Sequence, residues 1–149
     1  MRVMLADDEL LPLVHLKRML ECDIGGVEVI GTYSDPIQVI TMANALRPDA
    51  VFLDINMPEI SGLEIARQLK MSLPDIEIVF VTGYDHYAVQ AFELCAVDYM
   101  MKPVQLERLK QTVQRLQSKA NRSMEIERHV EPERISYFYQ VLNNLPVRR

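Results

Sequence analysis

The sequence has few of the features that mark secreted proteins, membrane proteins or proteins with cysteine-ligated metal sites. Its 149 residues include only two cysteines, Cys22 and Cys95, whose spacing matches neither a disulfide framework nor a pair of metal ligands. No apolar run approaches the roughly 20 residues that a membrane-spanning helix needs. Acidic residues begin at Asp7, which is too early for the apolar part of a signal peptide. We therefore expect a soluble, cytoplasmic protein that does not contact the membrane.

Positive charge is scarce over the first two thirds of the chain. Residues 1–103 carry 7 basic and 16 acidic side chains, whereas residues 104–149 carry 9 basic and 5 acidic ones. Binding to duplex nucleic acid depends on neutralising phosphates, so the acidic part does not suit direct contact with DNA. The basic segment is interpreted as a solvated helix surface. Any contact with DNA would need an output domain that is not evident in this chain.

What the sequence does contain is typical of one globular domain with a tail. Hydrophobic residues make up 49% and charged residues 25% of the chain. Five short apolar runs, several of them nearly continuous, indicate strands that are covered on both faces. These runs are Val3 to Ala6, Val27 to Ile30, Ala50 to Leu53, Ile76 to Val81 and Ala96 to Met101.

Segments with helical spacing of apolar residues follow each of these runs. They cover residues 10–20, 36–47, 63–73, 87–95 and 106–120. The second segment opens with Ser34-Asp35-Pro36, a cap followed by proline in the first helical position. Strict alternation of strand and helix predicts parallel pairing with right-handed crossovers. The expected fold class is α/β, a doubly wound, flavodoxin-like parallel sheet of order 2-1-3-4-5 with a C-terminal helical extension.

Polar residues stand where the predicted strands end. Asp7 and Asp8 follow the first strand, Asp54 the third, Thr82 closes the fourth, and Lys102 follows the fifth. In doubly wound sheets, ligands bind outside the carboxyl ends of the strands, at the switch point between the first and third strands. Clustered carboxylates repel one another unless a cation joins them. Oxygen ligands of this kind suit an exchangeable Mg²⁺ that also takes a phosphate oxygen.

At these residues the chain resembles the receiver domains of bacterial response regulators, over roughly residues 1–118. Each matching segment is weak alone, but their order and spacing together are specific. The segments are Asp7-Asp8, Leu53-Asp54-Ile55-Asn56-Met57-Pro58-Glu59-Ile60-Ser61-Gly62, Thr82-Gly83 and Tyr99-Met100-Met101-Lys102-Pro103. A softer resemblance, over residues 81–94, points to receivers of LytTR-type regulators and of regulators with activator-type (BTAD) winged-helix output domains.

The resemblance implies a role for each residue at the predicted edge. Asp54 is the expected acceptor of a phosphoryl group from a sensor histidine kinase. The expected Mg²⁺ ligands are Asp8 and Asp54 directly, Asp7 through water and Asn56 through its main-chain carbonyl. Three further roles are implied: Thr82 and Lys102 contact the phosphoryl group, Thr82 and Tyr99 form the switch, and the Lys102–Pro103 bond is cis.

Phosphorylation is expected to alter the surface formed by the fourth helix, fifth strand and fifth helix, and so to control homodimerisation or an output domain, most simply in transcription. We expect a self-phosphorylating acceptor rather than a turnover enzyme, with autophosphatase activity left open. The alternative is a stand-alone phosphorelay or protein-interaction module without DNA-binding output. A metal-dependent phosphohydrolase is a third reading, for which the sequence offers no obvious general acid–base.

The domain organisation predicted from the sequence is a receiver over residues 1–119 followed by a tail over residues 120–149. Residues 121–133 are interpreted as a linker or an exposed helix extension, and residues 134–145 as a short amphipathic helix. The apolar residues of segment 106–120 recur at intervals of three and four. This spacing suits a helix lying on the sheet, and if it continues past residue 120 it also suits a dimer seam or a linker helix. The tail is long enough for a linker and too short for a helix-turn-helix output domain.

Overall fold

The computed structural model describes residues 1–128, and the chain divides into two compact units, Met1–Leu116 and Gln117–Arg149. Strands and helices alternate through the first unit, as the sequence predicts. The elements are β1 (Arg2–Ala6), α1 (Leu10–Arg18), η1 (Met19–Ile24, a short π-helix), β2 (Glu28–Tyr33), α2 (Pro36–Leu46), β3 (Ala50–Leu53), α3 (Gly62–Ser72), β4 (Glu77–Thr82), α4 (Ala88–Glu93), β5 (Asp98–Met101) and α5 (Leu106–Arg128). None of the helices within residues 1–128 combines the length and the apolar composition needed to cross a membrane.

The five strands form one parallel sheet in the order β2-β1-β3-β4-β5, which confirms the predicted fold class. The register decides where the functional edge lies. Ala6 at the end of β1 pairs with Leu53 at the end of β3. The next residues of the two strands, Asp7 and Asp54, therefore leave the sheet at the same edge. Thr82 at the end of β4 pairs with Met101 at the end of β5, which brings Lys102 to that edge as well.

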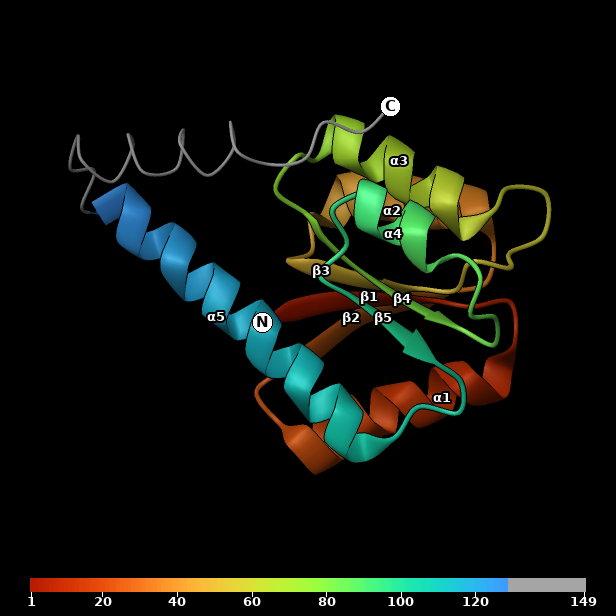
Figure 1. Ribbon diagram of the computed structural model, residues 1–149, viewed down its shortest axis with the longest axis horizontal. Coiled ribbons are helices and arrows are strands. Elements are labelled where there is room, and N and C mark those ends of the chain that lie inside the picture. The colour runs from red at the N-terminus through yellow and green to blue at the C-terminus, as the bar shows by residue number, and fades with distance from the viewer. Residues whose placement is uncertain (129–149) are drawn as a thin grey trace. The chain divides into compact units, whose positions relative to one another are not determined.

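Two apolar cores cover the two faces of the sheet. Successive strand residues point to opposite faces, so Val3 and Leu5 belong to one core whereas Met4 and Ala6 belong to the other. The first core is completed by α1, η1 and the part of α5 up to Leu116, and the second by α2, α3 and α4 (Figure 1). Burial on both faces explains why the strands appear in the sequence as nearly continuous apolar runs.

Helix boundaries follow the predicted capping residues. The side chain of Asp35 accepts a hydrogen bond of 2.9 Å from the backbone N–H of Ile37, and Pro36 occupies the first helical position of α2. Both features were predicted from the sequence and are confirmed. Ser61 caps α3 in the same way, through the backbone N–H of Glu64 at 3.3 Å. These caps satisfy backbone donors that a helix leaves unpaired in its first turn.

One expectation about the last two helices needs correction, and another is confirmed. The predicted fourth helix is shorter than expected, because Cys95 adopts a left-handed conformation (φ 57°) after α4 has ended at Glu93. In α5, Leu109, Val113 and Leu116 are buried in the core against the sheet. Their spacing therefore reflects packing on the sheet, which is one of the two readings of this segment, whereas a dimer seam or linker helix past residue 120 stays a prediction.

The helix α5 continues to Arg128, so the first part of the predicted linker is helical. The amphipathic helix predicted for residues 134–145 lies outside the described residues. The domain boundary at residue 119 stays a prediction.

Candidate functional site

The site begins where β1 and β3 end. The backbone N–H of Asp54 donates to the carbonyl of Ala6 at 2.9 Å, and that of Asp7 donates to the carbonyl of Tyr33 at 3.1 Å. These bonds extend the ladders of the sheet by one residue and fix the backbone of both aspartates. Asp7 and Asp54 are each only 5% exposed, whereas Asp8 is exposed at the surface. The residues at the switch point are thus held by the sheet itself.

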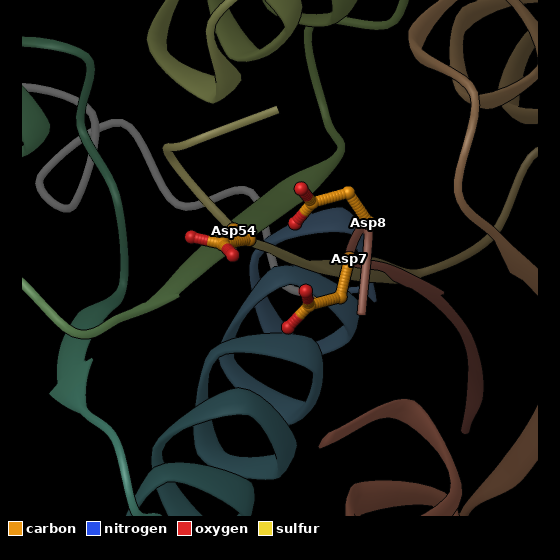
Figure 2. Close-up of side chains that lie close together, drawn as sticks. All are labelled: Asp7, Asp8 and Asp54. Carbon is orange, nitrogen blue, oxygen red and sulfur yellow. The ribbon is translucent and has the colours of Figure 1, made fainter. Parts of the chain in front are cut away.

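Three carboxylates gather at this point, as Figure 2 shows for Asp7, Asp8 and Asp54. One oxygen from each lies within 4.8 Å of the others. Such a set of oxygen atoms fits a hard divalent cation, which takes one or two carboxylates and fills its other positions with water or phosphate oxygens. The exposure of Asp8 leaves the cluster open to solvent. The residues present therefore fit Mg²⁺.

Lys102 reaches the same cluster from the loop after β5. Its Nζ lies 2.6 Å from Oδ2 of Asp7 and 2.9 Å from Oδ2 of Asp54. The loop is held by a hydrogen bond of 2.8 Å from the backbone N–H of Lys102 to the carbonyl of Thr82, and the following peptide bond to Pro103 is cis. The ammonium group bridges two carboxylates that would otherwise repel each other.

The electrostatics of the cluster follow from burial and from this bridge. Burial raises the pKa of Asp54 above its usual value, with a further contribution from Asp7, and only part of this rise is offset by Lys102 and by the backbone N–H of Asn56. Burial alone would lower the pKa of Lys102, but hydrogen bonds to Asp7 and Asp54 outweigh it and raise that pKa. With three ionised carboxylates and one ammonium, the net charge is about −2, which a divalent cation would neutralise.

The loop after Asp54 is shaped by a close contact with the start of α3. The backbone N–H of Asn56 donates to Oδ1 of Asp54 at 3.1 Å, and the N–H of Gly62 donates to the carbonyl of Ile55 at 2.7 Å. A Cβ atom added at Gly62 would overlap the carbonyl oxygen of Asp54 and lie 2.8 Å from its carbonyl carbon. Glycine is therefore required at position 62 for the chain to return this close to Asp54.

Thr82 and Tyr99, predicted as the switch pair, are connected through the backbone of Tyr84. Thr82 is fully buried at the end of β4, and its Oγ1 accepts a hydrogen bond of 3.4 Å from the N–H of Tyr84. The hydroxyl of Tyr99 donates to the carbonyl oxygen of Tyr84. Sequence reasoning missed this connection, because Tyr84 contributes main-chain atoms that carry no residue-specific signal.

A second feature that sequence reasoning missed is the hydrogen-bond network of Asp98, the residue before Tyr99. The largely buried carboxylate of Asp98 accepts hydrogen bonds from Arg108 at 2.6 Å and Thr112 at 2.7 Å, both on α5. Burial opposes the charge of Asp98, but Arg108, Thr112 and the N–H of Tyr99 together lower its pKa below the usual value. The spacing of Arg108 and Thr112, four residues apart on one helix face, was the available signal. This network ties α5 to β5.

The fold and the site define a class of protein, and comparisons with known proteins agree. The family model of the response regulator receiver domain matches residues 3–114. This chain therefore belongs to the response regulator receiver domain family. The matching region includes every candidate site residue given above.

Individual relatives support the same assignment. A response regulatory protein of Vibrio cholerae is 50% identical over 114 residues, covering 76% of this chain and 47% of that protein. The transcriptional regulatory protein BtsR of Escherichia coli is 39% identical over 121 residues, covering 81% of this chain and 50% of BtsR. This chain thus spans about half the length of the curated relatives it matches.

Solved structures show the same fold. The response regulatory domain of protein mrkE from Klebsiella pneumoniae has a TM-score of 0.76 at 32% identity, with 82% of this chain and 99% of that chain covered. The response regulator TrrA from Thermotoga maritima, solved in complex with Mg²⁺-BeF, has a TM-score of 0.69 at 31% identity, with 77% and 97% covered.

Proposed function

We propose that Asp54 accepts a phosphoryl group from a phosphohistidine of a sensor histidine kinase. An Oδ oxygen of Asp54 forms the new bond to phosphorus while the P–N bond to the histidine breaks, and the bonding electrons return to the imidazole nitrogen. The observation that carries the proposal is the position of Lys102, whose Nζ bridges Asp54 and Asp7 inside a group of three carboxylates. Catalysis of this kind rests on positioning and on charge neutralisation.

Mg²⁺ is the proposed cofactor. Asp8 and Asp54 would hold it directly, Asp7 through water, and Asn56 through its main-chain carbonyl. The metal would neutralise charge on the transferred group and orient its oxygens. The protein supplies the rest: the sheet fixes the backbone of Asp54, burial of Asp54 limits the access of water, and Lys102 places a positive charge beside the acceptor oxygen.

The proposed switch uses the contacts of Thr82. A phosphoryl group on Asp54 adds about −1.5 to −2 charges, which attract Lys102 and the hydroxyl of Thr82. When Thr82 turns toward the phosphoryl group, the N–H of Tyr84 loses its acceptor and the backbone that also binds Tyr99 is released to move. Shifting an equilibrium from 1:99 to 99:1 needs about 5.5 kcal/mol. Two or three charge-assisted contacts of about 1.5–3 kcal/mol each add up to about 3–9 kcal/mol, a range that includes this value.

The surface that responds is proposed to be that of α4, β5 and α5. Val89 and Phe92 on α4 are 66% and 65% exposed, and Met101 at the end of β5 is 43% exposed. Val89 and Phe92 are three residues apart and so lie on one side of α4, and exposed apolar side chains that lie together mark protein contacts. We assign this surface to homodimerisation or to an output domain, with cytoplasmic control of transcription as the function. The name of BtsR as a transcriptional regulatory protein supports this assignment, and any contact with DNA is assigned to an output domain.

Incubation with acetyl phosphate and Mg²⁺, followed by intact mass measurement, tests the acceptor. Wild-type protein should gain one phosphoryl group and Asp54→Asn none. The matched control is Asp75→Asn, an exposed aspartate between α3 and β4 that should label like the wild type. Equal labelling of wild type and Asp54→Asn would refute the acceptor. Size exclusion of the same samples then shows whether the labelled protein self-associates or stays monomeric, as a stand-alone module would.

A further inference from the structure

A cavity of about 620 Å³ lies under α1, on the face of the sheet opposite to α3. Its floor includes Phe52 of β3 and Val81 of β4, so it reaches down to the sheet. Leu16 on the inner side of α1 forms one wall, and Pro103 and Val104 from the loop after β5 form the other. Cavities of about 300–1,000 Å³ with mostly apolar walls are typical of small-molecule sites.

Four polar side chains complete the lining: Asp7, Glu9, His15 and Lys102. The ammonium of Lys102 is already engaged by Asp7 and by Asp54, which does not line the cavity. Glu9 is exposed, and none of the side chains that the structure describes hydrogen-bonds or pairs with its carboxylate. The charge left for a ligand at this cavity is therefore negative.

We propose that this cavity binds a small organic cation that has an apolar body and one ammonium group. The apolar body fits against Phe52 and Val81, where its burial removes apolar surface from water. The ammonium group lies beside Glu9 at the mouth. An anion is disfavoured, because the carboxylates of Asp7 and Glu9 would repel it while the one lysine of the lining is already paired. A bound cation would lie against the salt bridge between Asp7 and Lys102, so its binding would change the electrostatics of the carboxylate cluster around Asp54.

The test uses three probes that share one apolar body and differ only in their head group. They are 4-phenylbutylamine, 4-phenylbutanol and 5-phenylpentanoate, each titrated into the ¹⁵N-labelled full chain without Mg²⁺ or phosphoryl donor. We expect saturable shifts of backbone amide signals from α1 and from Val104 with the amine. Its Kd should be on the order of 1 mM, because about eleven heavy atoms of ordinary ligand efficiency give about that affinity. The alcohol and the acid should bind at least about fivefold more weakly.

Two matched pairs of variants localise the binding. Leu11, which lines the cavity and is 81% exposed, can become tryptophan without loss of core packing, and Leu11→Trp should weaken amine binding at least about fivefold by filling the mouth. Val14→Trp, on the same helix but outside the lining, should bind like the wild type. Glu9→Gln should remove most of the preference for the amine, whereas Glu59→Gln, outside the lining of the cavity, should keep it.

These outcomes decide the proposal. It is supported by saturable binding of the amine that Leu11→Trp and Glu9→Gln weaken and their controls do not. It is overturned if no saturable shift appears up to 10 mM, if the acid binds as tightly as the amine, or if Leu11→Trp binds like the wild type. Because the titration needs neither phosphorylation nor metal, its result is independent of the role proposed for Asp54.

Discussion

The side-chain nitrogen of Lys102 lies 2.9 Å from Oδ2 of Asp54, although 48 positions separate the two residues in the chain. The parallel register of the sheet makes this contact possible, because β3, β4 and β5 end at one edge. The contact places a fixed positive charge beside the proposed acceptor oxygen before any phosphoryl group arrives. Preorganised charges of this kind act strongly at partly buried sites.

Replacing Lys102 by alanine should slow the labelling of Asp54 by acetyl phosphate roughly 100-fold, as the loss of one preorganised donor does in enzymes. Intact mass against time measures the rate at a fixed Mg²⁺ concentration. Lys110→Ala, which removes an exposed pair with Glu107 on α5, should label at the wild-type rate. An unchanged rate in Lys102→Ala would show that the lysine is only a structural partner of the aspartates.

Gly62→Ala should destabilise the domain by about 3 kcal/mol, because the added methyl group would overlap the carbonyl of Asp54 and force the backbone apart. Gly83→Ala offers the matched control, since a Cβ there would meet no atom within 4 Å. Its stability should stay within about 0.5 kcal/mol of the wild type. Urea denaturation followed by circular dichroism measures both changes. Equal stability of the two variants would contradict the close approach at Gly62.

Asp98→Asn should destabilise the protein by about 2 kcal/mol at pH 7, because Arg108 and Thr112 lose their charged partner. The folded state lowers the pKa of Asp98, so its stabilising contribution is complete above the usual pKa of 3.8 and is lost as the pH falls through the lower folded value. The difference between wild type and variant should therefore shrink below about pH 4. Urea denaturation from pH 3 to 7 measures it. Glu107→Gln, whose partner Lys110 is on the surface, should show little difference at any of these pH values.

Tyr99→Phe should separate phosphorylation from its consequence. The variant loses the hydrogen bond to the carbonyl of Tyr84, at a cost of about 1 kcal/mol, but every proposed phosphoryl contact remains. Labelling of Asp54 should therefore proceed at the wild-type rate, while the change in self-association after labelling is reduced. Tyr84→Phe should leave both unchanged, because that residue acts through its main chain. Combined mass and size-exclusion measurements distinguish these results, and a slower labelling of Tyr99→Phe would place Tyr99 in the acceptor chemistry instead.

Phe92→Asp should abolish any increase in size that follows phosphorylation, because a charge on α4 would be buried in the proposed contact. Met71→Asp on α3 is the control. Met71 is also strongly exposed and apolar, but lies on a different helix, and the variant should associate like the wild type. Light scattering of labelled samples gives the masses. Association that persists in Phe92→Asp would move the interface away from α4.

The sequence predicted the sheet order and the gathering of Asp7, Asp54 and Lys102 at one edge, because both follow from general rules for parallel strands and from the position of polar residues after apolar runs. It did not predict the end of α4, where a single left-handed residue, Cys95, stops the helix. It left open whether the pattern of the last helix continues past residue 120 as a dimer seam or a linker helix, since the same spacing also suits a helix packed on the sheet. Contacts made by peptide groups, and the cavity under α1, depend on the three-dimensional arrangement of the chain, which the pattern of residue types does not reveal.

The link between Thr82 and Tyr99 passes through the amide and carbonyl of Tyr84, so its chemistry belongs to the polypeptide rather than to a particular amino acid. Side-chain scanning would find position 84 silent even if it transmits the whole signal. Two kinds of change would uncouple Thr82 from Tyr99. One is replacement of the backbone amide of Tyr84 by an ester, and the other is a one-residue change in the length of the loop between β4 and α4. The amino acid at position 84 could then change without effect, whereas the length of the loop between β4 and α4 could not.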